Sequence, residues 1–206
     1  MIAMPVIAVT GGFGTGKTTV SHLLADCGVK VIDVDEIVYE LEEPGQPAWQ
    51  KIVAEFGKTV LNADRSLNRS KLAALVFKDK AALYKLNECV HPEVLVETQK
   101  RIQSAKRNFD GLVVVDIPLL FEVNWQKYFD KIVVVTASEK NVLNRIGKNR
   151  HLSAIEINQR IQNQLPLSFK KEKADFLVDN DSDIGQTKKQ VLTIFQALLD
   201  KPKSQD

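Results

Sequence analysis

Residues 11–18 read Gly-Gly-Phe-Gly-Thr-Gly-Lys-Thr, and the rest of the chain is arranged around this loop. The apolar run before it, residues 6–9, predicts a buried strand, and the residues from Lys17 to about Cys27 predict a helix that ends at Gly28. Strand, loop and helix in this order fit the pattern G-x-x-x-x-G-K-[ST], whose glycines let the backbone turn tightly close to an anion. The sequence therefore predicts a phosphate-binding loop.

Each part of this loop has an expected task in binding ATP. Successive N–H groups and the positive end of the helix would face the phosphates. Lys17 would reach the β- and γ-phosphates, and the Thr18 hydroxyl would hold Mg²⁺. A glycine-rich turn with a solvated lysine is the alternative, and the agreement between strand, loop and helix disfavours it. The expected ATP-binding residues are Gly12, Phe13, Gly14, Thr15, Gly16, Lys17, Thr18 and Thr19.

The composition bounds the class of protein. A chain of 206 residues, 44% hydrophobic and 26% charged, is long enough for one α/β domain with insertions. The net charge of +2 gives no support for wholesale nucleic-acid binding. No apolar run of about 18 residues predicts a membrane span. We expect a monomer without nucleic-acid or membrane partners.

The ends and the cysteines indicate a cytoplasmic protein. Residues 1–5 lack the charged and apolar regions of a signal peptide, and the sequence leaves open whether Met1 or Met4 is the start. Cys27 and Cys89 are far apart and have no metal-ligand spacing, which suits a reducing compartment. Residues 201–206 form a polar tail that we expect to be disordered.

Further strands and helices follow in an alternating order. Buried strands are predicted at 111–116 and 131–136, a second strand at 29–33, and a short final strand with its exit turn at 174–180. Helices are predicted from 36, at 48–56, 70–77 and 81–106, from Ser138 to about Asn149, and at 152–164 and 184–199. The helix at 81–106 is expected to be divided at His91-Pro92, because proline begins or kinks a helix. The loop pattern and this order predict a parallel sheet, with a helical insertion between strands two and three.

Acidic residues stand at the ends of two predicted strands, where ligands bind in open parallel sheets. Asp33 and Asp35 end the second strand, and each could accept a proton or position Mg²⁺, or could cap the helix expected from Glu36. The residues leave both interpretations open for each aspartate. Asp116 ends the third strand, in the position of a Mg²⁺-associated aspartate of phosphate-loop NTPases.

A basic segment lies late in the chain. Its members are Arg145, Lys148, Arg150, Arg160, Lys170, Lys171 and Lys173, opposed only by Glu156 and Glu172. The segment could close as a lid and place an arginine on the transferring phosphoryl group. A solvated helix face is the alternative, and we favour it for every residue of the set except Arg145.

Together these motifs resemble the dephospho-coenzyme A kinase family over nearly the whole chain. The resemblance depends on residues 9–19, 31–35, His91-Pro92, residues 115–122, Arg160-Ile161, Gln164 and residues 174–180. It implies a P-loop NTPase-type three-layer α/β/α parallel sheet with a helical substrate-domain insertion and a helical lid. The expected parts are a core at 1–40, 108–140 and 174–200, an insertion at about 41–107 and a lid at about 141–173.

The resemblance also implies a reaction. It is the transfer of a phosphoryl group from ATP, with Mg²⁺, to the ribose 3′-hydroxyl of dephospho-coenzyme A. Asp35 corresponds to the family's proposed base, Arg145 resembles the lid arginine, and His91 falls in the acceptor-binding region. The expected catalytic residues are Asp35, Lys17 and Arg145, the acceptor-binding residues Asp33, Asp35, His91, Pro118 and Leu119, and the metal residues Thr18 and, through water, Asp116.

The sequence departs from the family pattern at two positions. Tyr39 and Asn149 stand where the family often has arginine, and Arg150 adjoins the second. A missing charge there would weaken acceptor binding rather than change the reaction. Two other functions stay open: another small-molecule kinase, such as a nucleoside or nucleotide kinase, and a nucleotide-dependent switch. Against the second, no guanine-reading Asn-Lys-x-Asp follows residues 133–135.

Overall fold

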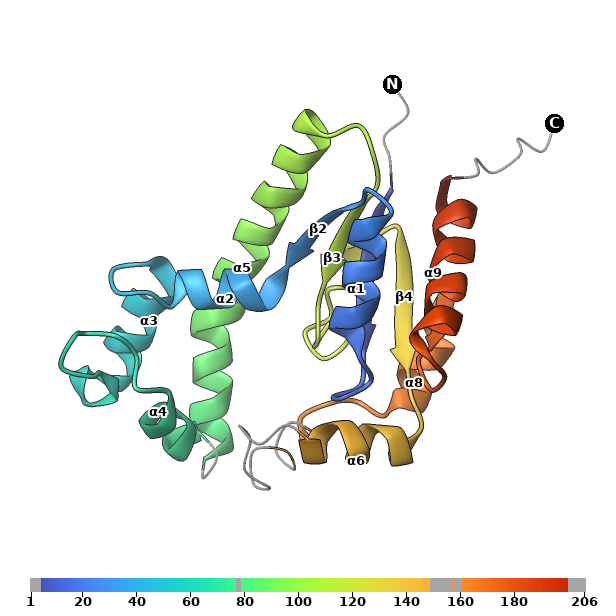
Figure 1. Cartoon of the computed structure of the whole chain (residues 1–206). Helices are drawn as coiled ribbons and strands as arrows, with labels where there is room; N and C mark the ends of the chain where they lie inside the picture. The colour runs from blue at the N-terminus through green and yellow to red at the C-terminus, as the bar shows by residue number, and fades with distance from the viewer. Residues whose placement is uncertain (1–4, 77–78, 149–156, 158–160, 200–206) are drawn as a thin grey trace. The chain divides into compact units, whose positions relative to one another are not determined.

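The computed structural model describes residues 5–76, 79–148, 157 and 161–199. Its centre is a five-stranded sheet with the strand order β2-β3-β1-β4-β5 (Figure 1). The strands are β1 (Val6–Gly11), β2 (Lys30–Asp33), β3 (Val113–Asp116), β4 (Lys131–Thr136) and β5 (Phe176–Asp179). The pairs β1–β3, β1–β4 and β4–β5 are parallel. The predicted parallel sheet is confirmed, and β1 lies at its centre.

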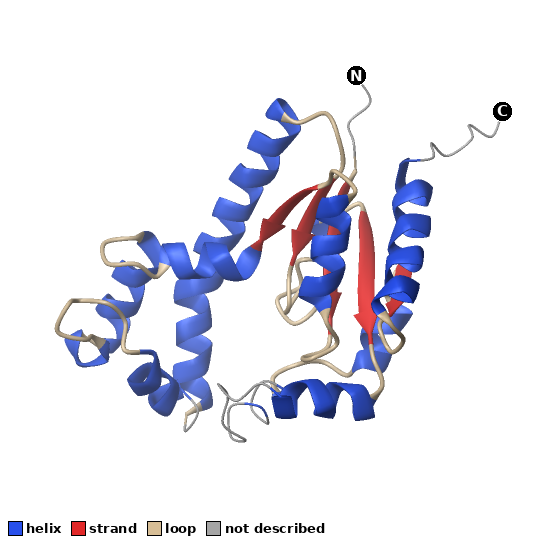
Figure 2. Ribbon diagram, viewed as in Figure 1, coloured by secondary structure: helices blue, strands red, loops and turns tan. Residues whose placement is uncertain are grey.

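Both faces of the central strands are buried, because helices and turns cover them. All six residues of β1 and all four of β3 are buried, which explains why these strands are runs of apolar residues rather than alternating ones. On one face of the sheet, α1 (Lys17–Asp26) and α9 (Ile184–Leu199) lie side by side (Figure 2). Val20, Leu24, Val191 and Ile194 of these helices belong to one buried apolar cluster. The short helix α8 (Leu167–Glu172) contacts β4.

The chain divides into two compact units, residues 1–32 with 104–206 and residues 33–103. The second unit is helical: α2 (Val34–Leu41), α3 (Pro47–Phe56), a 3₁₀ turn (Lys58–Val60), α4 (Arg69–Val76) and most of α5 (Lys80–Asn108). Ile37, Ile52 and Val94 are among its buried side chains. Trp49 Nε1 donates to the carbonyl oxygen of Arg65 at 2.8 Å, and this bond fixes the loop between the 3₁₀ turn and α4.

Most predicted elements are present within a few residues of their expected bounds, and those of β4 and α9 agree throughout. The expected division at Pro92 is wrong: α5 is one helix of 29 residues with Pro92 inside it. Helix α8 was not predicted. The helix expected at 152–164 lies mostly outside the described residues, and so do Met1, Met4, Asn149, Arg150 and Arg160. Within the described ranges, no helix has the length and apolarity needed to cross a membrane.

Candidate active site

The predicted phosphate loop joins β1 to α1, as the sequence indicates. Gly16 is the N-cap of α1 with φ 88° and ψ 31°, a left-handed conformation that glycine adopts without steric cost. Gly16 has no side chain, so none caps this helix end. The first N–H groups of α1 lack partners within the helix, and the helix dipole adds a partial positive charge to them. The end of the helix is therefore suited to an anion.

Close packing against Asn180 also requires a residue without a side chain at position 16. Asn180 follows β5 and is buried, and its Nδ2 would overlap a Cβ atom added at Gly16. Asn180 Nδ2 donates to the Thr15 carbonyl oxygen at 2.8 Å, and Thr187 Oγ1 in α9 donates to Asn180 Oδ1 at 2.9 Å. Asn180 is thus held by α9 and in turn fixes the backbone of the loop.

Arg145, the predicted lid arginine, extends from α6 (Glu139–Lys148) to the same part of the loop. Its Nη1 donates to the Thr15 carbonyl oxygen at 2.9 Å, and its Nη2 donates to the carbonyl oxygen of Asn180. The structure thus places the guanidinium beside the loop, bound to backbone oxygens. Contact between Arg145 and a phosphoryl group stays a prediction.

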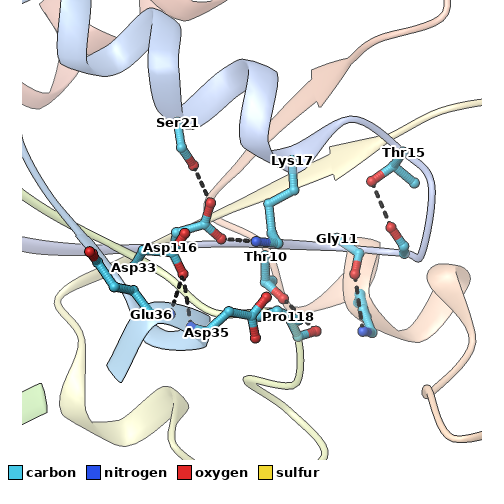
Figure 3. A network of polar contacts seen from close by, with 12 residues as sticks. Thr10, Gly11, Thr15, Lys17, Ser21, Asp33, Asp35, Glu36, Asp116 and Pro118 are labelled. Carbon is cyan, nitrogen blue, oxygen red and sulfur yellow. Dashed lines mark hydrogen bonds and ion pairs between the residues drawn. The ribbon is translucent and has the colours of Figure 1, made fainter. Parts of the chain in front are cut away.

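The half-buried Lys17 and the buried Asp116 and Ser21 form one polar group (Figure 3). The Lys17 ammonium, at the start of α1, forms an ion pair with Asp116 Oδ1. Ser21 Oγ, one helical turn further on, donates to Asp116 Oδ2 at 2.7 Å. The Asp116 carboxylate, at the end of β3, is 2% exposed. Sequence reasoning missed Ser21, because nothing local distinguishes a serine that bonds a residue 95 positions away.

The donors at the loop fit Mg²⁺ bound partly by phosphates and water. No group of three acidic, histidine or cysteine side chains that could hold a metal occurs in the described part of the chain. Mg²⁺ in nucleotide sites takes only one or two protein ligands and keeps several waters. Thr18 is exposed in the first turn of α1, and both oxygens of Asp116 already accept hydrogen bonds. This suits a direct role for Thr18 and a water-mediated one for Asp116.

The aspartates at residues 33 and 35 begin the second compact unit. Helix α2 starts at Val34 rather than Glu36, with Asp33 as its N-cap. Asp33 Oδ1 accepts from the N–H groups of Asp35 at 2.8 Å and Glu36 at 3.4 Å, and Figure 3 shows both bonds. The capping interpretation is confirmed for Asp33. Asp35 is not the cap; it is exposed in the first turn of the helix.

Two further candidate positions of the second unit lie on its helices. His91 is half-buried within α5, and burial lowers its pKa from the usual value of 6.5. Tyr39 is exposed on α2, and the guanidinium carbon of Arg69 lies 4.4 Å from the centre of its ring. Arg69 also forms an ion pair with Glu42 at 2.7 Å. A positive charge is thus present beside residue 39, although the residue itself is tyrosine.

Pro118 and Leu119 follow β3 in a turn, half-buried, as expected for residues that leave the sheet. Thr10 Oγ1 in β1 donates to the Pro118 carbonyl oxygen at 3.4 Å (Figure 3). The turn is therefore attached to the strand that leads into the loop. Their contact with an acceptor stays a prediction.

Lys170 departs most from the prediction, which put it on a solvated helix face. Its side chain is fully buried, and its Nζ lies 2.8 Å from Glu122 Oε1 and 3.3 Å from the Gly11 carbonyl oxygen. Gln164, just before α8, accepts at Oε1 from the Phe13 N–H at 2.7 Å. The partners of these residues lie 48 to 159 positions away along the chain, so local patterns do not indicate the contacts.

Comparison with known proteins agrees with this geometry. The family model described as dephospho-CoA kinase matches residues 5–186. The chain belongs to the dephospho-CoA kinase family. Curated members include dephospho-CoA kinases of Carboxydothermus hydrogenoformans, 40% identical with 95% of each chain covered, and of Lactiplantibacillus plantarum, 42% identical with 91% of this chain and 94% of that one covered.

A solved structure supports the same fold. The crystal structure of TT1252 from Thermus thermophilus superposes on this chain with a TM-score of 0.81 and 28% identity, over 96% of this chain and 98% of the other. The resemblance inferred from the motifs is confirmed as membership of the dephospho-CoA kinase family. The α/β kinase fold is confirmed with it.

Proposed function

We propose that this chain transfers the γ-phosphoryl group of ATP to the ribose 3′-hydroxyl of dephospho-coenzyme A, giving coenzyme A and ADP. The observation that carries the proposal is the uncapped, glycine-turned start of α1 with Lys17 and Asp116 beside it, in a member of this family. Phosphoryl transfer needs little covalent chemistry from the protein, so positioning and charge account for most of the catalysis.

The loop binds the phosphates in this proposal. The N–H groups of Phe13 to Thr18 donate to the β- and γ-phosphate oxygens, and the Lys17 ammonium adds charge next to the transferring group. Arg145 contributes a second positive charge beside Thr15. Thr18 would hold Mg²⁺ directly and Asp116 through water, and the ion would supply positive charge to offset that on the phosphates. In this proposal residues 141–173 act as the lid that places Arg145 on the transferring phosphoryl group.

Asp35 is the proposed base. Its carboxylate orients the 3′-hydroxyl and accepts its proton as the phosphoryl group transfers, while Asp33, His91, Pro118 and Leu119 bind the acceptor. The exposure of Asp35 in the first turn of α2 supports access to a ligand. The proposal includes a monomeric, cytoplasmic enzyme.

The acceptor is tested by measuring ADP release with Mg²⁺ and ATP in the presence of dephospho-coenzyme A, adenosine, nucleoside monophosphates or no acceptor. We expect turnover with dephospho-coenzyme A to exceed every other rate. Faster release with a nucleoside or nucleotide would assign a different small-molecule kinase. Slow release that no acceptor changes would contradict a kinase and favour a nucleotide-dependent switch.

A further inference from the structure

Several carbonyl oxygens of the phosphate loop accept hydrogen bonds from side chains. Thr15 Oγ1 donates to the Gly12 carbonyl oxygen at 2.8 Å, and Asn180 and Arg145 donate to that of Thr15. Lys170 Nζ lies 3.3 Å from that of Gly11, the last residue of β1. A carbonyl oxygen carries partial negative charge and would repel a phosphate. Donors that hold these oxygens also fix the direction of the peptide planes and of their N–H groups.

Lys170 differs from the other donors because it brings a full charge into the interior. Its side chain is 0% exposed, and a buried ammonium is costly unless it is paired and hydrogen-bonded. Glu122 supplies the charge partner at 2.8 Å, and Glu122 Oε1 also accepts from the Leu165 N–H at 2.8 Å. The pair therefore joins α8 and the chain before it to the turn after β3.

The pair is poorly arranged for stability alone. Glu122 Oε2 is buried and has no hydrogen-bond partner among the described residues, so part of the carboxylate's lost hydration is not replaced. Buried ion pairs can often be exchanged for apolar side chains with no loss of stability. What an apolar pair could not supply is a donor for the Gly11 carbonyl oxygen, at the point where the strand becomes the loop.

We propose that Lys170 is a positioning residue for ATP: its ammonium holds the Gly11 carbonyl oxygen so that the loop's N–H groups face the phosphates, and Glu122 neutralises it in the interior. This inference rests on the proposed binding of ATP at the loop. Lys170 touches no phosphate; it acts through the backbone of Gly11. Its removal therefore weakens ATP binding, while the acceptor's own binding residues are untouched.

Two single substitutions distinguish a role of Lys170 in positioning the loop from a role of the ion pair in stabilising the fold. Lys170→Met and Glu122→Gln each break the ion pair, but only Lys170→Met removes the donor from Gly11. We expect the dissociation constant for MgATP, measured by calorimetric titration, to rise about tenfold in Lys170→Met, as for one lost hydrogen bond, and to change less than threefold in Glu122→Gln. Equal weakening in both variants would mean that the pair only supports the fold, and would overturn the proposal.

A double substitution tests the proposal even where a single variant, with one buried charge left unpaired, fails to fold. Lys170→Met with Glu122→Met removes the charges together and should keep the urea midpoint of the wild type, yet bind MgATP about tenfold more weakly. Wild-type affinity in a stably folded double variant would overturn the proposal. Lys171→Met, which removes an exposed charge from the same helix, is the matched control and should bind MgATP as the wild type does.

The titration needs no acceptor, so it separates this inference from the proposed function. Wild-type protein that binds MgATP but does not phosphorylate dephospho-coenzyme A would contradict the function and leave the role of Lys170 measurable. Wild-type protein that binds no MgATP would overturn both. Where turnover is present, we expect Lys170→Met to raise the KM for ATP and to leave the KM for dephospho-coenzyme A unchanged.

Discussion

Two strand-to-helix junctions in this chain differ in what accepts hydrogen bonds from the first N–H groups of the helix. Where β1 passes into α1, the N-cap is Gly16, and no side chain caps the helix. Where β2 passes into α2, the N-cap is Asp33, whose carboxylate accepts from two backbone N–H groups. Both helices begin with N–H groups that need acceptors. The first junction leaves them to an anion from outside, and the second satisfies them from within the chain.

The residue at the N-cap distinguishes a junction suited to an anion from one that is capped by its own chain. A carboxylate at the N-cap position removes the positive potential that would attract a phosphate, whereas glycine preserves it. The N-cap carboxylate therefore makes the second junction less suited to a phosphate than the first, while Asp35, two residues further on, is exposed on the first turn. In the proposed function the first junction binds ATP, and the second presents the base.

The largest predicted change in activity concerns Asp35, the proposed base at the second junction. Asp35→Asn removes the proposed base while keeping the size of the side chain, so turnover of dephospho-coenzyme A should fall about 10³-fold. MgATP binding, measured by titration, should stay within threefold of the wild type. Glu36→Gln, on the same exposed turn, is the control and should retain turnover. Undiminished turnover in Asp35→Asn would remove Asp35 from the mechanism.

A smaller effect tests the glycine of the first junction. Gly16→Ala places a Cβ against Asn180 and strains a residue with positive φ, so MgATP affinity should fall about 10- to 100-fold. Gly28→Ala is the matched control: it has φ +81° but nothing within 4 Å of the added atom. It should lose some stability without losing MgATP affinity. If both variants bind MgATP with the same affinity, close packing at residue 16 does not contribute to MgATP binding.

The smallest effect concerns the cap of the second junction. Asp33→Ala removes the acceptor for two N–H groups and should lower the free energy of unfolding by about 1 kcal/mol. Asp33→Asn keeps a capping oxygen and should unfold at nearly the urea concentration of the wild type. A raised KM for dephospho-coenzyme A in Asp33→Asn would show that the aspartate also binds the acceptor. Unchanged stability in Asp33→Ala would contradict its role as a cap.

The sequence was sufficient where a local pattern determines the structure. The loop, the central strands and α9 follow from glycine spacing, apolar runs and helical periodicity, and Asp116 follows from its place at the end of β3. The unbroken α5 did not follow, because a single proline can be accommodated inside a long helix that tertiary contacts support.

Lys170, Gln164 and Asn180 show where sequence reasoning ends. Each contacts the loop from a position more than 140 residues away along the chain. Gln164 and Asn180 lie in stretches that carry the family resemblance, but no local pattern gives their contacts with the loop, and Lys170 has an ordinary sequence neighbourhood. Lys170 was expected on a solvated face because most lysines in a basic segment are. Only the folded chain, with α8 against β4, brings its ammonium to Gly11.

The bond from the Phe13 N–H to Gln164 Oε1, 2.7 Å long, has a consequence for selectivity. A ligand that takes this N–H must outcompete a neutral amide oxygen that already accepts from it. Hydrogen bonds to a charged acceptor are roughly twice as strong as those between neutral groups. Phosphate oxygens are therefore better able than the hydroxyl of an uncharged nucleoside to replace Gln164 at this N–H, so the bond favours anionic ligands.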